Sequence, residues 1–444
     1  MKYLTGALLF VLIIPVLILC GCGGEDTSLS RYPDIVLILI DSARADHLSI
    51  NGYFRETTPV LDSLASGGTI WTRVQGQSSW TLPAMASIMT GLSQRAHGAG
   101  YYNDVFYGID TSLPTIPLML RRSAGYQTAA FFNGVFMSED FGFHQGFDFF
   151  DCQYTPGKAN LRNAEEIVND FLQWYDAHRD PAKPLFSAIH FLDPHLPYSP
   201  PSPWDTLYSD PKSDNLFNIF WGRRNDVLDL NNGLVEMNSA QLDIMVGLYD
   251  GELAFTDSQI GRLLSELEAR GTLQNTVFVI VGDHGEEFLD HGGFGHGHTL
   301  YQEILNVPLI ISGRSIPIGV NDEVVAQIDI LPTVLGISGL AVPIWADGLD
   351  ILSAESPLTS RLITSSNLVS ATPDMAAIRL DDMVVMGNPQ DGSPVLFDLA
   401  NDPFEQNPLV PGRETIDQLY YYWSLPPNNY PQSVPYAHGI ERTL

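Results

Sequence analysis

The chain has 444 residues, of which 45% are hydrophobic and 11% are aromatic, a composition typical of globular rather than disordered proteins. Its 22 Lys and Arg residues face 52 Asp and Glu residues, which gives a formal net charge of −30. A surface this acidic repels nucleic acids and anionic membranes, so we exclude nucleic acid as a partner. An anionic substrate would need local positive charge, and a bound metal ion is the economical source because basic residues are few.

The N-terminus is predicted to be a lipoprotein signal peptide over residues 1–21. Lys2 precedes the apolar run "ALLFVLIIPVLIL", which as a helix would span about 20 Å, short of the ~30 Å hydrocarbon core of a bilayer. The following "LCGC" resembles a bacterial lipobox, which predicts lipidation of Cys22, with Cys20 or an unmodified signal peptide as alternatives. We therefore expect residues 22–33 to tether an exported protein to the bacterial cell envelope, at its periplasmic face or at the cell surface.

Two buried strands are predicted far apart in the chain, in "DIVLILID" and in "TVFVIVGDHG". Both are continuous apolar runs without alternation, as expected for parallel strands that are covered on both faces. They end at Asp41 and Asp283, and ligands of α/β sheets gather at the carboxyl ends of parallel strands. These two acids are therefore candidates to converge on one cation.

Helical and strand patterns alternate between the two predicted strands, which indicates an α/β layered fold over residues 34–350. "TTPVLDSLASGG" and "GELAFTDSQIGRLLSELEARG" are predicted helices that stop at glycines. Over residues 351–412 the pattern changes to short amphipathic strands, as in "AAIRLDDMVVMGN", which predicts a small β-rich subdomain. Residues 413–444 are predicted to be a tail without an assigned function.

Thr81 is the candidate for a reacting hydroxyl. It precedes the predicted helix of "TLPAMASIMTG", where backbone N–H groups and the helix dipole favour an anion. For this stretch alone, a threonine that only caps the helix is the simpler interpretation. Together with Asp41, Asp283 and the adjacent His284, however, Thr81 completes a set of hard oxygens and one imidazole, which favours Zn²⁺ or Mn²⁺ over Mg²⁺ or Ca²⁺. A hydroxyl beside such a metal is an activated nucleophile.

Further histidines are concentrated in "GDHGEEFLDHGGFGHGH". His296 and His298 are two positions apart, so in an extended segment both side chains would point the same way. His291 is predicted to be structural or solvated. His195, in "FLDPHLPY", follows another predicted strand end, where a functional histidine and a structural one in a Pro-rich turn are equally compatible with the sequence.

Several segments resemble, in family order, the sulfatase family of the alkaline-phosphatase superfamily. They include "PDIVLILIDSARADHLSINGY", "WTLPAMASIMTGLSQRAHG", "FLDPHLPY", "VIVGDHGEEFLDHG" and "LFDLANDPFEQNPL", and the resemblance covers roughly residues 33–410. It implies an alkaline-phosphatase-like α/β sandwich around a mixed, largely parallel sheet, with a small C-terminal β-rich subdomain. It also implies hydrolysis of sulfate esters, or of phosphate esters in related branches. In the resemblance, Asp41 and Asp283 match metal-binding acids, Thr81 matches the nucleophile, and His195 matches a histidine that contacts the substrate or leaving group.

The chain departs from the family pattern at several of these positions. Sulfatases with a formylglycine nucleophile carry C/S-x-P-x-R, whereas this chain has "TLPAM", with neither a convertible residue nor the Arg. Ser42 stands where a second Asp is usual, His284 replaces an amide ligand, and His298 replaces a Lys. A formylglycine hydrate expels sulfate through an extra hydroxyl that Thr lacks, so Thr81 with His284 is more similar to the phosphate-handling branches.

The sequence therefore predicts a lipid-anchored, metal-dependent hydrolase or transferase of small-molecule, glycan or lipid-headgroup esters, with phosphoryl chemistry favoured. Two alternatives stay open: a formylglycine-independent sulfuric ester hydrolase, and a catalytically weak sulfatase-like binding lipoprotein. Thr81, His195 and His298 are the predicted catalytic residues. The predicted metal ligands are Asp41, Thr81, Asp283 and His284. One or two ions are compatible with the sequence: His195, His296 and His298 either hold a second ion or contact the non-bridging oxygens and the leaving group directly.

Overall fold

The computed structural model describes most of the chain that follows the N-terminal segment. The described residues are 31–102, 105–153, 161–209, 224–353, 358, 360–367, 375–388, 393–424 and 435–436. The predicted signal peptide and both candidate lipidation sites, Cys20 and Cys22, lie outside them. Within these ranges, no helix combines the length and the apolar character needed to cross a membrane.

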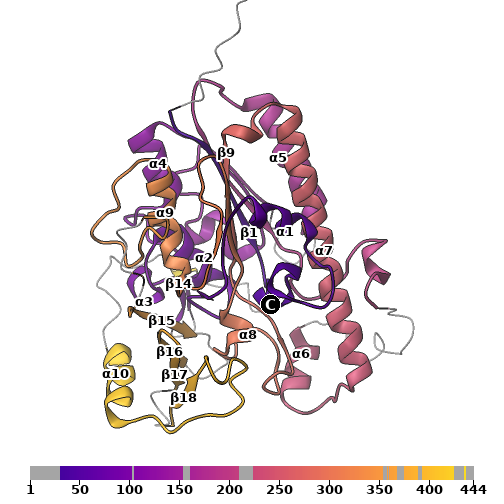
Figure 1. The fold of residues 1–444 in the computed structure, drawn as a ribbon, viewed down its shortest axis with the longest axis vertical. Helices are drawn as coiled ribbons and strands as arrows, with labels where there is room; N and C mark the ends of the chain where they lie inside the picture. Colours follow the sequence, from indigo (N-terminus) through magenta and orange to yellow (C-terminus); the bar gives the residue numbers. More distant parts are fainter. Residues whose placement is uncertain are drawn as a thin grey trace, which may run out of the picture.

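A mixed sheet of eight strands forms the centre of the molecule (Figure 1). In chain order its strands are β1 (Asp34–Ile40), β2 (Gly68–Trp71), β6 (Gln127–Asn133), β7 (Phe149–Gln153), β8 (Leu185–Phe191), β9 (Thr276–Gly282), β12 (Leu309–Gly313) and β13 (Gly319–Asn321). The spatial order is β13-β2-β12-β9-β1-β8-β6-β7, and the strands from β9 to β7 are parallel. Only β12 runs antiparallel to its neighbours in this sheet. The predicted mixed, largely parallel sheet is thus confirmed.

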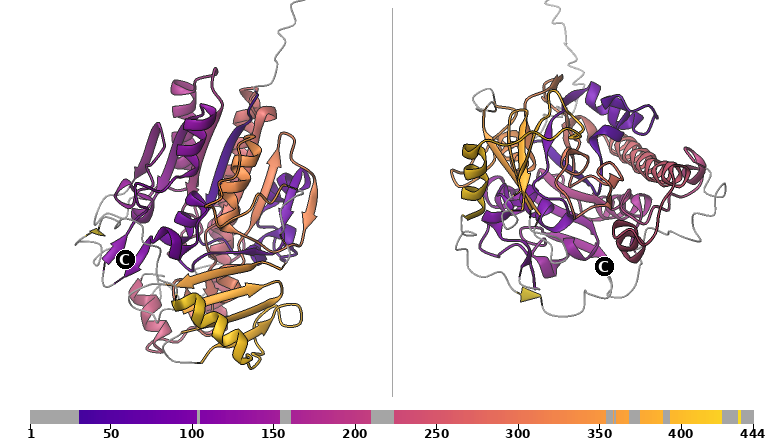
Figure 2. Two further views of the ribbon diagram at one scale, coloured as in Figure 1. Left: turned by 90° about the vertical axis from the view of Figure 1, so that its left-hand side faces the viewer. Right: turned by 90° about the horizontal axis from the view of Figure 1, so that it is seen from below.

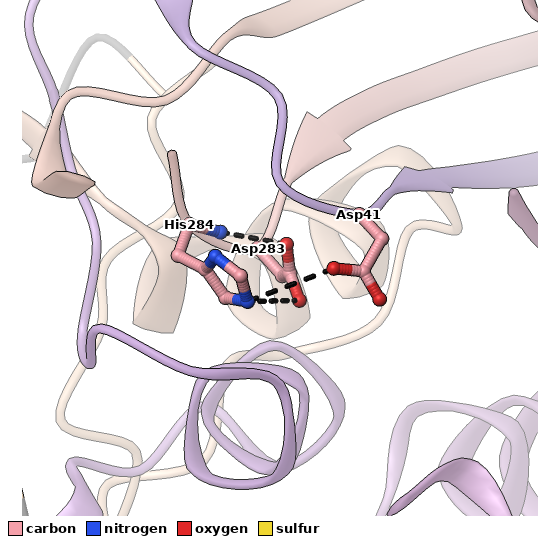
Figure 3. Close-up of side chains that lie close together, drawn as sticks. All are labelled: Asp41, Asp283 and His284. Carbon is pink, nitrogen blue, oxygen red and sulfur yellow. Dashed lines mark hydrogen bonds and ion pairs between the residues drawn. The ribbon is translucent and has the colours of Figure 1, made fainter. Parts of the chain in front are cut away.

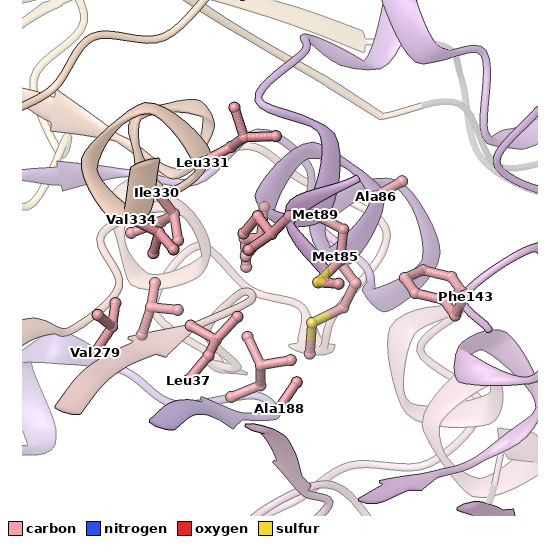
Figure 4. Packing of buried hydrophobic residues seen from close by; sticks show 14 of the residues in the cluster. Leu37, Met85, Ala86, Met89, Phe143, Ala188, Val279, Ile330, Leu331 and Val334 are labelled. Atoms are coloured by element: carbon pink, nitrogen blue, oxygen red, sulfur yellow. The ribbon is translucent and has the colours of Figure 1, made fainter. Parts of the chain in front are cut away.

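Helices cover both faces of this sheet (Figures 1 and 2). One face carries α2 (Thr81–Thr90), α4 (Ile116–Ala124) and α9 (Ile330–Ile337), and the other carries α1 (Pro59–Ser66), α5 (Ala164–His178) and α7 (Ser239–Ala269). Successive side chains of a strand point to opposite faces. Leu37 of β1 therefore packs in one core with Met85 and Met89 of α2 (Figure 4), while Ile38 packs in the other core with Phe171 of α5. Burial on both faces explains the unbroken apolar runs.

A separate antiparallel sheet follows toward the C-terminus, at the bottom of Figure 1. Its strands are β15 (Leu362–Asn367), β16 (Met375–Leu380), β17 (Met383–Gly387) and β18 (Val395–Asp398), and α10 (Arg413–Ser424) contacts β16 and β17. Leu300 and Leu305 of the main body share an apolar cluster with Val384 and Phe397 of this sheet. The small β-rich subdomain is confirmed, while its predicted limits at residues 351 and 412 stay predictions.

Other described elements are short. They are α3 (Gln94–His97), α6 (Arg224–Asn231), α8 (Gln302–Leu305), β3 (Val74–Gln75), β4 (Gly100–Tyr102), β5 (Val105–Tyr107), β10 (Glu287–Phe288), β11 (Phe294–Gly295), β14 (Val325–Ala326) and β19 (Pro435–Tyr436). β4 and β5 form a hairpin, and β19 pairs with β5 to make a three-stranded sheet.

Candidate active site

Two neighbouring strands deliver the acidic residues of the candidate site. β1 and β9 are parallel partners with Ile40 opposite Gly282, so the residues that follow them, Asp41 and Asp283, emerge side by side. Asp41, Asp283 and His284 each offer one ligand atom, and these atoms lie within 4.8 Å of one another (Figure 3). All three side chains are at most 1% exposed. The sequence-predicted convergence of the two strand-terminal acids on one point is therefore present in the structure.

Hydrogen bonds occupy one side of the Asp283 carboxylate and one side of the His284 ring, whereas both oxygens of Asp41 have neighbours, Ser42 Oγ at 3.2 Å from Oδ1 and His190 Nε2 at 3.3 Å from Oδ2. Asp283 Oδ1 accepts from the backbone N–H groups of Ser42 (3.0 Å) and His284 (2.7 Å), whereas Oδ2 is buried without a hydrogen-bond partner. His284 Nδ1 lies 2.9 Å from the Gly285 carbonyl, to which it donates its proton. The Nε2 lone pair then faces Asp283 Oδ2 at 3.3 Å and Asp41 Oδ1 at 3.6 Å. The imidazole lone pair and the unpartnered Asp283 Oδ2 thus face each other.

The electrostatics of this cluster favour a bound cation. Burial raises the pKa of Asp283 well above its usual value, and the charge of Asp41 raises it further. Burial also raises the pKa of Asp41, but the imidazoles of His195, His190 and His284 outweigh it and hold this pKa below its usual value. In the described part of the chain, no Lys or Arg forms an ion pair with either acid. Two buried carboxylates and an imidazole lone pair that lie against one another, with no Lys or Arg paired to them in the described residues, fit a divalent metal ion.

Thr81 lies at the edge of the same cluster. It is the first residue of α2, and its Oγ1 is 3.4 Å from His284 Nε2. Trp80 occupies the N-cap position, and no side chain caps the helix there. The simpler interpretation of Thr81 as a helix cap is therefore wrong, since its hydroxyl faces the histidine instead.

The other predicted histidines fall into two groups. The rings of His195 and His296 lie 4.8 Å apart, and His296 lies 4.3 Å from His284, measured between ring centroids. His296 Nδ1 lies 2.8 Å from Glu286 Oε1. Burial lowers the pKa of His296, but this carboxylate outweighs it and raises the pKa above its usual value. These two histidines are thus brought to the cluster.

His298 and His291 have carboxylate partners of their own. His298 Nε2 lies 2.7 Å from Glu287 Oε2, and His291 Nδ1 lies 2.7 Å from Glu303 Oε1. Gly297, between His296 and His298, has φ +84°, so the segment is not extended and the two rings diverge. Over the described ranges, His195, His296 and His298 do not converge in the way Asp41, Asp283 and His284 do. A second ion and a catalytic role for His298 stay predictions.

His190 is a site residue that was not predicted from the sequence. It lies in β8, paired with Leu39 of β1, and is 0% exposed. Its Nε2 is 3.3 Å from Asp41 Oδ2, on the side of that carboxylate away from His284. A histidine near the end of the mostly apolar "LFSAIHF" was the available signal, because a buried polar side chain in a central strand needs a partner.

Two further side chains hold the turns that carry the acids. Tyr249, fully buried on α7, donates to the Ser42 carbonyl (2.9 Å) and accepts from the Arg44 N–H (2.8 Å). Ser42 has φ 55°, an uncommon value for a residue with a side chain. The two hydrogen bonds of the Tyr249 hydroxyl stabilise this backbone conformation. Gln327 donates to the carbonyls of Gly282 (2.8 Å) and Asp283 (2.5 Å). The site is therefore preformed by rigid supports.

Comparisons with known proteins agree with this architecture. A family model described as Sulfatase matches residues 33–340. The arylsulfatase of Clostridium perfringens is 26% identical, over 88% of this chain and 92% of its own, and the N-acetylglucosamine-6-O-sulfatase of Bacteroides thetaiotaomicron is 24% identical, over 75% and 73%. A solved complex with D-glucosamine-2-N,6-O-disulfate has a TM-score of 0.72 at 19% identity, covering 90% of this chain and 100% of that one.

The fold is also shared with an enzyme of another ester class. The phosphonate monoester hydrolase of Agrobacterium radiobacter has a TM-score of 0.66 at 21% identity, over 88% of this chain and 94% of its own. Because the Sulfatase model covers more than half of the chain, the family predicted from the sequence motifs is confirmed. This chain belongs to the sulfatase family of ester hydrolases, within the alkaline-phosphatase superfamily.

Proposed function

We propose that this chain is a phosphate-ester hydrolase in which the Thr81 hydroxyl receives the phosphoryl group. The observation that carries the proposal is the position of Thr81 Oγ1, 3.4 Å from His284 Nε2 and at the edge of the Asp41–Asp283–His284 cluster. A threonine has no second hydroxyl with which to expel sulfate as a formylglycine hydrate does. A phosphoryl group on threonine needs no such help, because water can attack phosphorus and release phosphate.

The donor set suits a transition metal ion. Asp41, Asp283, His284 and Thr81 supply carboxylate oxygens, one imidazole nitrogen and one hydroxyl, a mixture that favours Zn²⁺ or Mn²⁺ over Ca²⁺. Such an ion would lower the pKa of the Thr81 hydroxyl and offset the negative charge of the transferred group. It would also supply the positive charge that the acidic chain otherwise lacks.

The chain's own residues then have defined tasks. Thr81 Oγ attacks phosphorus, and the new O–P bond forms as the P–O bond to the leaving alcohol breaks. The alcohol leaves with a proton, and water attacks the threonine phosphoester, which releases inorganic phosphate and restores the hydroxyl. The N-terminus of α2 presents backbone N–H groups to the phosphoryl oxygens. We assign His195 and His296, whose rings lie beside one another, to hydrogen bonds with these oxygens and with the leaving group.

A second candidate is hydrolysis of sulfate esters through the same threonine. It is favoured by the relatives, since the arylsulfatase of Clostridium perfringens matches 88% of this chain. The two functions share the site, and they differ in the atom that Thr81 attacks.

The test is metal analysis of the purified protein together with assays on phenyl phosphate, diphenyl phosphate and phenyl sulfate. We expect stoichiometric Zn²⁺ or Mn²⁺, and turnover of a phosphate ester that exceeds turnover of phenyl sulfate. Faster turnover of phenyl sulfate would support the second candidate. Protein without bound metal, in which Asp283→Ala leaves ligand binding unchanged, would instead support a binding protein.

A further inference from the structure

His296 lies in a segment that is rich in glycine but is held on both sides. Its neighbours are Gly295 (φ 87°) and Gly297 (φ 84°), two residues without a side chain to restrict the backbone. Gly295 pairs with Glu287 in the β10–β11 hairpin, and the Gly297 carbonyl accepts a hydrogen bond from Asn367 Nδ2 at the end of β15 (2.8 Å). The main freedom left to His296 is therefore rotation of its side chain.

The carboxylate of Glu286 restricts this rotation. Its Oε1 lies 2.8 Å from His296 Nδ1. The Glu286 side chain is completely buried, whereas that of His296 is 18% exposed, so part of the imidazole ring stays accessible. A buried carboxylate is stabilised by a hydrogen-bond donor, and the ring nitrogen supplies one. The contact therefore holds the ring from its buried side.

The same contact decides which ring nitrogen is left for the substrate. An ionised carboxylate only accepts hydrogen bonds, so Nδ1 of His296 donates to Glu286 and Nε2 is the nitrogen that stays available. The centroid of the His296 ring lies 4.3 Å from that of His284, whose Nε2 is 3.4 Å from Thr81 Oγ1. Glu286 thus orients a ring that is two short contacts away from the proposed nucleophile.

His195, the other histidine beside the cluster, is held in a different way. Its Nδ1 lies 2.5 Å from the carbonyl oxygen of Leu196, the next residue in the chain. That contact comes from the local backbone, whereas the contact of His296 comes from a side chain ten residues away. Of the two histidines, His296 is therefore the one whose orientation can be released by a single substitution.

We propose that Glu286 is a positioning residue, which keeps Nε2 of His296 turned to the substrate and affects turnover only through that ring. This inference rests on the proposed function, since it takes His296 to contact the phosphoryl oxygens or the leaving group. Glu286 itself does not touch the substrate, because its side chain is completely buried. A displacement of about 1 Å in a group that contacts the reacting atoms can cost on the order of 100-fold in rate.

A double-mutant cycle between Glu286→Leu and His296→Gln tests the inference. Leu keeps most of the volume of Glu but cannot accept a hydrogen bond from Nδ1. We expect Glu286→Leu to lower kcat about 10-fold to 100-fold in the otherwise wild-type protein, and by less than about twofold when His296 is already Gln. Equal losses in both backgrounds would show that Glu286 acts through the fold and would overturn the inference.

Glu286→Gln separates the hydrogen bond from the charge. Gln keeps an acceptor at the same reach, so this variant should restore most of the kcat that Glu286→Leu loses. Glu303→Leu is the matched control, because Glu303 Oε1 lies 2.7 Å from Nδ1 of the structural His291, and kcat should stay unchanged. Equal losses in the Gln and Leu variants of Glu286, or the same loss in the control, would contradict the assignment. Glu286→Ala, which adds no bulk, repeats the test if Leu prevents folding.

Two further readouts do not depend on turnover. Metal content should be equal in Glu286→Leu and the wild-type protein, and loss of one equivalent would place His296 in a metal site and overturn the inference. Nitrogen NMR spectra of protein labelled in its histidine rings should show the proton of His296 on Nδ1 in the wild-type protein and in Glu286→Gln. Glu286→Leu should give a mixture of the two tautomers. Identical spectra for all three proteins would also contradict the proposal.

The outcomes separate this inference from the proposed function. The cycle uses whichever of phenyl phosphate, diphenyl phosphate and phenyl sulfate is turned over fastest, so it does not depend on the class of ester. If Thr81→Ala keeps full turnover but Glu286 and His296 are coupled, the nucleophile assignment fails and the role of Glu286 stands. If turnover requires Thr81 but the two residues are not coupled, the reverse holds.

Discussion

His284 and His291 lie in the same glycine-rich segment, but their ring nitrogens are hydrogen-bonded differently. His284 donates from Nδ1 to the Gly285 carbonyl and turns the Nε2 lone pair toward Asp41, Asp283 and the Thr81 hydroxyl. His291 uses Nδ1 on Glu303, places Nε2 3.2 Å from the Glu405 carbonyl, and stacks on Tyr301 with ring centroids 3.6 Å apart. The proposed ligand histidine thus keeps a lone pair that faces the two acids, whereas the structural histidine has both nitrogens engaged.

The largest effect is expected on the His284 side of this comparison. Asp283→Asn keeps the size of the side chain but removes the negative charge of the carboxylate. In the wild-type protein, Oδ2 of this carboxylate has no hydrogen-bond partner. We expect metal affinity, measured by competition with a chelator, to fall by more than about 100-fold, because the change removes a ligand rather than a supporting residue. Glu303→Gln, which alters the acid beside His291, is the control and should keep the metal. Normal metal binding by Asp283→Asn would remove Asp283 from the ligand set.

His190 sharpens the comparison, because it contacts a proposed ligand without belonging to the three-residue cluster. Its Nε2 lies 3.3 Å from Asp41 Oδ2, an arrangement that orients the carboxylate. We expect His190→Phe to weaken metal binding about 10-fold to 100-fold, as supporting residues around metal sites do. His190→Gln retains an N–H near the same position and should restore most of the affinity. Equal losses in both variants would instead identify His190 as a ligand.

His97 extends the comparison to a histidine remote from that segment. Its Nδ1 accepts from the Ala99 N–H (2.9 Å), and its Nε2 lies 3.0 Å from Ser87 Oγ, to which it donates. Burial lowers the pKa of His97 to about 3. The folded state therefore binds this proton less readily than the unfolded state does, and stability is lost as pH falls from about 6.5 toward 3.

Urea unfolding between pH 7 and pH 4 checks this expectation. The His97 contribution to the slope of unfolding free energy is at most about 1.4 kcal/mol per pH unit. His97→Gln should flatten the profile of the wild-type protein. An unchanged pH profile in His97→Gln would show that other groups carry the acid sensitivity.

The smallest effect is expected at His291. His291→Phe retains a ring to stack on Tyr301 but removes the bonds to Glu303 and to the Glu405 carbonyl. We expect a loss of about 1–2 kcal/mol in the free energy of unfolding, measured with urea, and unchanged metal content. Loss of metal in this variant would erase the distinction between the two histidines.

The sequence was sufficient to predict the acids of the site. Asp41 and Asp283 end apolar runs whose lack of alternation signals burial on both faces, and adjacent parallel strands then bring these ends together. His190 was not predicted because its partner Asp41 follows a different strand, and the pairing of β1 with β8 is not visible in a single sequence. The divergence of His296 and His298 depends on the positive φ of Gly297, which spacing alone does not reveal.

The start of α7 was also missed. The predicted helix began at Gly251, whereas α7 begins at Ser239, after a capping box formed by Asn238 and Gln241. Gly247 and Gly251 lower helix propensity, but both serve packing: a Cβ on Gly251 would lie 2.5 Å from the Trp204 carbonyl oxygen, and one on Gly247 would lie 2.5 Å from Ser209 Cβ. Tertiary contact thus overrides the local glycine signal.

The most direct test of the account is the metal-dependent turnover of Thr81→Ala beside the wild-type protein, with the preferred ester and matched metal content. We predict a fall in kcat of several orders of magnitude, with the metal and the fold retained. Thr81→Ser keeps a hydroxyl and should retain measurable turnover. Full metal-dependent turnover by Thr81→Ala would contradict the assignment of Thr81 as the nucleophile.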